Sequence, residues 1–242
     1  MDSHSKLEKI ILNNCELTEK SCSVLATVLS SKTILKEMNL NNSRLLDSGV
    51  KEICEGLKNP VCELKILNLK NNCITEGGCH VLAAALNSNP SNLTELDLSE
   101  NKLGNPGMKI ILTLFENEQC RLEKLKLSDC SISEEGYKAL SSALRSNPSH
   151  LIELDLTGND PGPSGVKQLS DLLQDGLCSL KTIRFLKSPA AEEACEYLTG
   201  VLGKSPLLLK ELDLSEDKLG DLDGEKLSAL LMDSHSKLEK IM

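Results

Sequence analysis

Aliphatic residues recur along the chain in the fixed pattern Leu-x-x-Leu-x-Leu-x-x-Asn/Cys-x-Leu. The clearest copy consists of Leu93, Leu96, Leu98, Asn101 and Leu103. Copies open at Leu7, Leu35, Leu64, Leu93, Leu122, Leu151, Leu180 and Leu209, and a partial ninth begins at Leu238. The first step is 28 residues and each later step is 29. Such regular spacing predicts a single repeat domain over residues 1–242, with eight complete repeats and no capping repeats.

Each repeat divides into two halves with different periodicity. The Leu-x-x-Leu-x-Leu stretch alternates as a short strand does, and the Asn or Cys after it is expected to turn the chain by binding buried backbone groups. The second half has helical spacing, as at Cys79, Leu82, Ala85 and Leu86. We therefore predict an α/β solenoid, a horseshoe with parallel strands on its concave face and helices on its convex face.

Charge and composition narrow the range of partners. The net charge is −9 with a pI near 5.1, which argues against nucleic acid and anionic membranes as partners and is compatible with a basic protein. No stretch reaches the roughly 20 apolar residues that span a bilayer, and the first residues lack the apolar run of a signal peptide. We expect a cytoplasmic protein.

The 28/29-residue repeat with a helix in every unit resembles the ribonuclease-inhibitor-like class of leucine-rich repeats. Within that class, residues 149–156 (Ser-His-Leu-Ile-Glu-Leu-Asp-Leu) and 161–167 (Pro-Gly-Pro-Ser-Gly-Val-Lys) are similar to C-terminal repeats of NACHT-containing NOD-like receptors, particularly those of fish. The resemblance implies a domain that senses ligands or holds a receptor inactive. No Gly-x-x-x-x-Gly-Lys-Ser/Thr motif is present, so ATP binding is not expected.

Most of the ten cysteines occupy shared positions of the repeat. The shared columns are Cys62, Cys120 and Cys178; Cys22, Cys79 and Cys195; and Cys15 with Cys130, whereas Cys54 and Cys73 fall outside them. Shared positions predict packing thiols in a reducing compartment. No Cys-x-x-Cys pair occurs, and we expect no metal and no cofactor.

Charged residues also recur, at the outward positions of the predicted strands. The candidate concave-face residues are Glu37, Asn39, Asn68, Glu95, Asp97, Lys124, Lys126, Glu153, Asp155, Arg184, Glu211 and Asp213. Because acidic and basic strands alternate, these residues are expected to stabilise the sheet by cross-strand pairing; the alternative is a polar recognition surface. Acid pairs that repeat periodically do not indicate an active site, and we predict no catalytic residue and no enzymatic activity.

Residues 1–10 are identical to residues 232–241, at an offset of 231 residues that equals eight whole repeats. The identity indicates either a recent duplication or an engineered block derived from a receptor-type array. The end of one chain could then continue into the start of another and form a homodimeric ring or a longer head-to-tail assembly. The candidate interface residues are Leu7, Lys9, Ile10, Leu238, Lys240 and Ile241.

The sequence therefore predicts a non-catalytic protein-interaction scaffold that associates through its ends. One alternative is a monomeric, ligand-sensing or autoinhibitory repeat domain of an innate immune receptor. Another is a ribonuclease-inhibitor-type binder of a basic protein, although both tyrosines, Tyr137 and Tyr197, fall on predicted helices away from the concave face.

Overall fold

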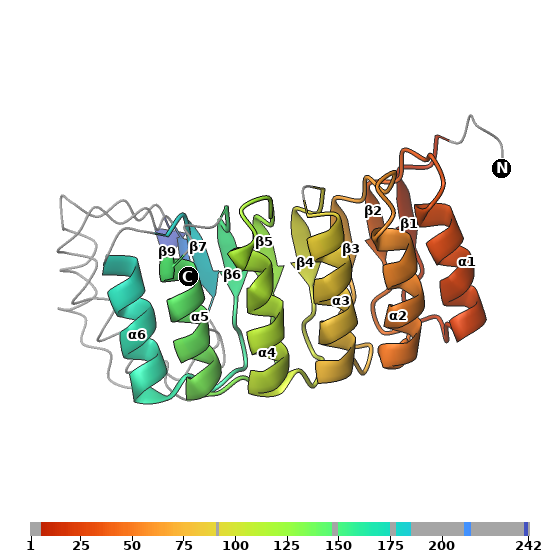
Figure 1. The fold of residues 1–242 in the computed structure, drawn as a ribbon. Coiled ribbons are helices and arrows are strands. Elements are labelled where there is room, and N and C mark those ends of the chain that lie inside the picture. The colour runs from red at the N-terminus through yellow and green to blue at the C-terminus, as the bar shows by residue number, and fades with distance from the viewer. Residues whose placement is uncertain are drawn as a thin grey trace.

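Strands and helices alternate along the chain and build two layers, with the helices side by side on one side of a sheet (Figure 1). The structure is a computed structural model that describes residues 6–90, 92–146, 150–174, 178–184, 211–213 and 240–241. The strands are β1 (Lys9–Ile11), β2 (Glu37–Asn39), β3 (Ile66–Asn68), β4 (Glu95–Asp97), β5 (Lys124–Lys126), β6 (Glu153–Asp155), β7 (Thr182–Arg184), β8 (Glu211–Asp213) and β9 (Lys240–Ile241). The described helices are α1 (Glu19–Leu29), α2 (Leu46–Leu57), α3 (Glu76–Ser88), α4 (Gly104–Leu112), α5 (Glu134–Ser146) and α6 (Gly162–Gln174), with a 3-10 helix η1 (Thr113–Glu116) after α4.

The strands form one parallel nine-stranded sheet in the order of the sequence. Each strand pairs with the next at the repeat spacing, so that Glu95 lies opposite Lys124 and Lys124 lies opposite Glu153. This arrangement confirms the predicted α/β solenoid. Six complete strand-and-helix units lie within the described residues, and the count of eight repeats stays a prediction.

The strands begin later than the sequence suggested. The first repeat copy opens at Leu7, whereas its strand runs from Lys9 to Ile11. The carbonyl oxygen of Glu8 accepts hydrogen bonds from the backbone nitrogens of both Lys36 and Glu37, at 2.8 and 3.1 Å. Because both donors share one acceptor there, the regular ladder starts only after Glu8.

The core is a stack of thin aliphatic layers between the sheet and the helices. Each layer takes its inward strand residue from the repeat pattern, as at Leu67, Leu96, Leu125 and Leu154, all fully buried. The helices contribute residues at the predicted spacing, among them Val50, Ile53 and Leu57 on α2. None of the described helices is both long and apolar enough to cross a membrane.

Buried asparagines bind successive repeats together directly after the strands. The Asn101 side-chain oxygen accepts from the backbone nitrogens of Asn72 and Ile74, at 2.9 and 3.0 Å. Its amide nitrogen donates to the carbonyl oxygens of Leu69 and Leu98, at 3.0 and 2.8 Å, and also to that of Ser99. Asn101 is 1% exposed, so its side chain satisfies backbone groups that water does not reach.

Equivalent residues repeat this arrangement in other units. Asn72 and Asn159 each accept from two backbone nitrogens of the preceding repeat, as Asn101 does. Cys130 takes the same position in the fifth repeat, where its thiol lies 3.3 Å from the Leu98 oxygen as a weak donor. The predicted role of the Asn/Cys position is thus confirmed, and we call this series the asparagine ladder.

The nine described cysteines are free thiols, and their predicted packing role is confirmed for most of them. Buried thiols occur at Cys22, Cys54, Cys62, Cys79, Cys130 and Cys178. The prediction is wrong for Cys73, which is exposed because its position lies one residue beyond the asparagine ladder. Burial raises the pKa of Cys54, Cys79 and Cys130 to about 12, since the thiolate would lose its hydration.

Replacement of Asn101 by alanine should strongly destabilise the protein. The change leaves two buried N–H groups and up to three carbonyl oxygens without their partner, and each unsatisfied buried group costs about 1–3 kcal/mol. The free energy of unfolding by urea should fall by at least about 3 kcal/mol. The exposed Asn13→Ala is the matched control, and equal losses in both variants would contradict the role of the ladder.

The buried thiols should make the protein less stable at alkaline pH. A thiol of the unfolded chain ionises near pH 9, whereas Cys54 and Cys79 stay protonated in the folded protein up to about pH 12. Their stabilising contribution is complete below pH 9 and is lost as the pH rises toward 12. Urea unfolding at about pH 8 and pH 10.5 should show this decline, and Cys54→Ala with Cys79→Ala should reduce it. An unchanged decline in that variant would refute the assignment.

Candidate functional site

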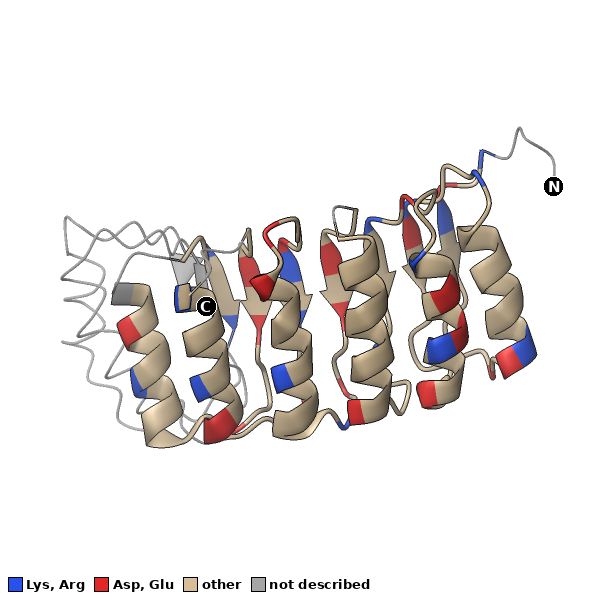
Figure 2. Ribbon diagram, viewed as in Figure 1, with Lys and Arg blue, Asp and Glu red and all other residues tan. Residues whose placement is uncertain are grey.

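The candidate site is the concave face, the side of the sheet turned away from the helices. Acidic and basic strands alternate there as predicted, and Figure 2 shows red and blue alternating from β4 to β6. The register places Glu95 opposite Lys124 and Asp97 opposite Lys126. The short strands and the inward leucines fix these side chains on the outer surface, because successive residues of a strand point to opposite faces.

Lys124 pairs straight across with its register partners on both sides, whereas Lys126 and Arg184 pair diagonally. Lys126 Nζ lies 3.1 Å from Glu95 Oε1, although Asp97 is its opposite residue in the register. Lys124 Nζ lies 3.7 Å from Glu95 Oε2 and 3.9 Å from Glu153 Oε2. Arg184 pairs with Glu153 in the same diagonal sense. We call Glu95, Lys124, Lys126, Glu153 and Arg184 the charge ladder.

Asp97 and Asp155 do not take part in the described ion pairs of this ladder, contrary to the expectation for paired carboxylates. Asp97 is only 8% exposed and accepts from the backbone nitrogen of Ser99 at 3.0 Å. Asp155 accepts from the backbone nitrogen and the hydroxyl of Thr157. These carboxylates close the turn after their own strand. The carboxylates that pair across strands are therefore Glu95 and Glu153.

Glu95 holds Lys126 in its charged form. Burial of Lys126 opposes its charge, but the hydrogen bond to Glu95 and the nearby carboxylates outweigh this effect. The pKa of Lys126 is consequently raised above its ordinary value.

The remaining predicted residues are spread along the same face. Lys9 Nζ lies 2.7 Å from Glu37 Oε1, which links β1 to β2. Asn39 closes its own turn by accepting from the backbone nitrogen of Asn41, and Asn68 is the last residue of β3. For Glu211 and Asp213 only the backbone of β8 is described.

The predicted end-to-end residues are described only in part. Leu7 is 53% exposed and Ile10 is partly buried. Lys240 and Ile241 form β9, of which only the backbone is described, and Leu238 lies outside the described residues.

Three outward residues were not among the candidates chosen from charge. Ile11, Ile66 and Thr182 share the strand positions of the charged residues, and Ile11 is 54% exposed. Their position in the repeat alone predicts that they lie on the concave face. They were missed because only charged and amide side chains were considered as candidates. The concave face thus presents apolar side chains beside its charged ones.

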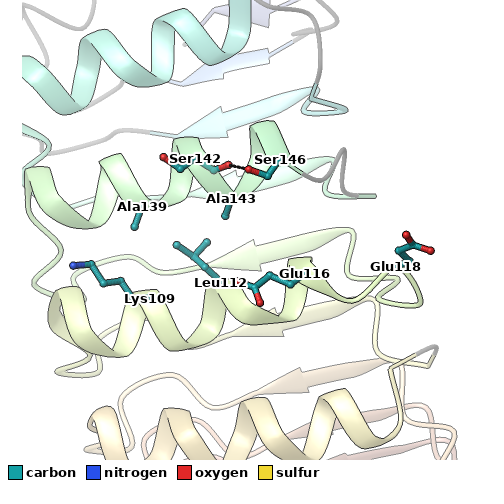
Figure 3. A pocket seen from close by; sticks show the side chains of 8 residues that line it. All are labelled: Lys109, Leu112, Glu116, Glu118, Ala139, Ser142, Ala143 and Ser146. Carbon is teal, nitrogen blue, oxygen red and sulfur yellow. Dashed lines mark hydrogen bonds between the residues drawn. The ribbon is translucent and has the colours of Figure 1, made fainter.

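The convex side has a groove of about 610 Å³ between α4 with η1 and α5. Figure 3 shows Leu112 facing Ala139 and Ala143 across it, with Lys109 near one end and Glu118 near the other. Small side chains on α5 leave this space open. The groove contains no histidine or cysteine, and so lacks a nucleophile and base pair of the Cys–His or Ser–His type.

The described residues also contain no group of three or more His, Cys, Asp or Glu side chains arranged to hold a metal ion. The two described histidines, His80 on α3 and His150 before β6, belong to different repeats and different repeat positions. His4 and His235 lie outside the described residues. The arrangement presented by the charge ladder is suited to contact with another molecule through ion pairs.

Known proteins share the repeat. The family model described as "Leucine Rich repeat" matches residues 89–111, 119–141 and 147–170. Ribonuclease inhibitor of Mus musculus is 43% identical over 60 residues, which cover 25% of this chain and 13% of that protein. NACHT, LRR and PYD domains-containing protein 1a of Mus musculus is 48% identical over 61 residues, 25% of this chain and 5% of that protein.

A solved structure shares the fold over almost the whole chain. The leucine-rich repeat-containing protein LegL7 from Legionella pneumophila matches with a TM-score of 0.59 and 17% identity, over 96% of this chain and 72% of that one. The matched segments are small parts of the two mouse proteins, so the likeness to them concerns the repeat. The chain is a leucine-rich-repeat solenoid whose repeats are similar to those of ribonuclease inhibitor and of NACHT, LRR and PYD proteins.

Proposed function

We propose that this chain is a non-catalytic protein-interaction scaffold that recognises its partner with the concave face. The observation that carries the proposal is the charge ladder. Charged groups of four neighbouring strands, β4 to β7, are held by one another on a sheet fixed from behind by buried leucines. Preorganised charges lose little side-chain freedom when a partner binds, and they select partners by charge pattern.

The relatives support a protein partner of this kind. Ribonuclease inhibitor is named for action on another protein, and the NACHT, LRR and PYD protein combines such repeats with other domains, as its name states. A monomeric sensing domain of an innate immune receptor and a ribonuclease-inhibitor-type binder of a basic protein both remain alternatives. A cytoplasmic location and the absence of nucleic acid, membrane and cofactor from its partners stay predictions.

Charge reversal on β5 should remove the partners that depend on the concave face. Proteins captured by the immobilised chain would be quantified by mass spectrometry for the wild type and for Lys124→Glu with Lys126→Glu. The control is Lys20→Glu with Lys51→Glu, which changes the charge equally on the exposed surfaces of α1 and α2. We expect a set of proteins retained by the wild type and the control but lost from the β5 variant. Identical sets for all three chains would contradict a role of the concave face.

We also propose head-to-tail self-association as a second function, because a specific backbone pairing favours it. Lys240 lies opposite Glu211 on β8, as Lys9 lies opposite Glu37 on β2. Since residues 232–241 repeat residues 1–10, the Lys9–Ile10 segment of a second copy offers β8 the same backbone and the same side chains. A copy whose Lys9–Ile10 segment takes the place of β9 on β8 would continue the array in register and bring α1 with it.

Self-association should appear as a molar mass above the 26.3 kDa of one chain. Multi-angle light scattering over a range of micromolar concentrations would measure it, with twice the chain mass expected for a closed ring and a growing mass for a filament. Lys9→Glu should weaken the association, because it places like charges at the junction with Glu211. A constant mass of one chain across the whole range would reject this second function.

A further inference from the structure

Two lysines of β5 converge on a single carboxylate at the centre of the charge ladder. Lys126 Nζ lies 3.1 Å from Glu95 Oε1, and Lys124 Nζ lies 3.7 Å from Glu95 Oε2. The two ammonium groups therefore face the two oxygens of one carboxylate. Groups held this way are also within reach of a second carboxylate that approaches from solvent.

Of these two lysines, Lys124 is the one whose ammonium group has hydrogen-bond donors available for a further acceptor. Its ammonium lies 3.7 Å from Glu95 Oε2 and 3.9 Å from Glu153 Oε2, which is beyond the usual distance of a hydrogen bond. Among the residues that the structure describes, the carboxylate oxygens paired with Lys124 Nζ all lie beyond 3.5 Å. A lysine ammonium has three donors, so an incoming acceptor can bind without displacing a close partner.

The lysines also lie further out than the acids that they pair with. The side chains of Lys124 and Lys126 are 46% and 32% exposed, whereas those of Glu95 and Glu153 are 17% and 19% exposed. The carboxylates of Asp97 and Asp155 accept from the N–H groups of their own turns, and Asp97 is only 8% exposed. A molecule that approaches β5 therefore meets ammonium groups first.

We infer that this part of the concave face receives an acidic segment of a partner protein, with one carboxylate bridging Lys124 and Lys126. The inference rests on the proposed function of the concave face as a protein-binding surface and names the chemistry of the partner. It differs from the basic partner with which the net charge of −9 is compatible. At about 0.15 M salt charges are screened beyond about 8 Å, so the nearest groups decide the contact.

The test uses three fluorescent peptides of about eight residues, long enough in extended form to cross β4 to β6. They have the same spacing of Gly and Ala, and carry either Glu, Gln or Lys at the remaining positions. Binding to the 242-residue chain is followed by fluorescence anisotropy at about 0.15 M salt. The Glu peptide should bind at least about tenfold more tightly than the Gln and Lys peptides.

Variants separate the lysine pair from general charge effects. Lys124→Ala with Lys126→Ala should weaken binding of the Glu peptide about tenfold or more. Lys20→Ala with Lys51→Ala alters the net charge equally on the helical side and should change binding less than about twofold. Glu95→Gln should strengthen binding, because it removes the carboxylate that competes for both ammonium groups. A gain of this kind is not expected if the ladder only stabilises the sheet.

Circular dichroism and thermal unfolding of each variant confirm that it is folded. Equal binding of the Glu and Gln peptides, or an unchanged affinity of the Lys124→Ala, Lys126→Ala variant, would overturn the inference. Preferred binding of the Lys peptide with dependence on Glu95 and Glu153 would also overturn it, while the concave face would remain a protein-binding surface. If the β5 charge-reversal variant loses partners in the capture experiment but the Glu peptide does not bind, the inference of an acidic partner is overturned. The proposed function of the concave face would then still stand.

Discussion

The fold depends on the need to satisfy backbone groups that become buried where each strand turns toward the helical layer. The turn cannot use a regular ladder, because the chain leaves the sheet there, and water is excluded by the neighbouring repeats. Asn101 solves this problem with one side chain that both accepts and donates, and it binds groups of its own repeat and of the preceding one. A buried amide in each of several units thereby sets the distance between layers and makes neighbouring repeats depend on each other.

The hydrogen bonds of the turns also influence which charged residues pair on the concave face. Asp97 and Asp155 lie at the last strand position, where their carboxylates are close to backbone nitrogens two residues later. Once they bind those nitrogens, Lys126 and Arg184 pair with the more distant glutamates, which produces the diagonal ion pairs. The charge ladder is therefore a consequence of turn chemistry beneath it. Its lysines stay outermost because their side chains are longer than those of the acids they pair with.

The space between the sheet and the helices differs in chemistry from the outer side of the sheet. Aliphatic residues and neutral thiols fill the space between sheet and helices, and a thiol such as Cys130 can replace the buried amide because it also donates weakly to the same carbonyl oxygens. Large rings are not needed in layers this thin, and the buried Tyr137 on α5 is an exception among the described residues. The outward side chains of the strands lie outside this core, and the proposed recognition surface is built from them.

The sequence by itself determined the solenoid, the order and parallel direction of the strands, the inward leucines and the role of the Asn/Cys position. These features follow from local periodicity, since a repeat of 29 residues places equivalent residues beside one another in every unit. It also placed the acidic and basic strands next to each other. Only the tertiary structure decided which charges pair, that Asp97 is held in a turn, that Lys124 keeps unused donors and that Cys73 is exposed. Those outcomes depend on competition between neighbouring groups over a few ångströms, which the spacing of residues along the chain does not encode.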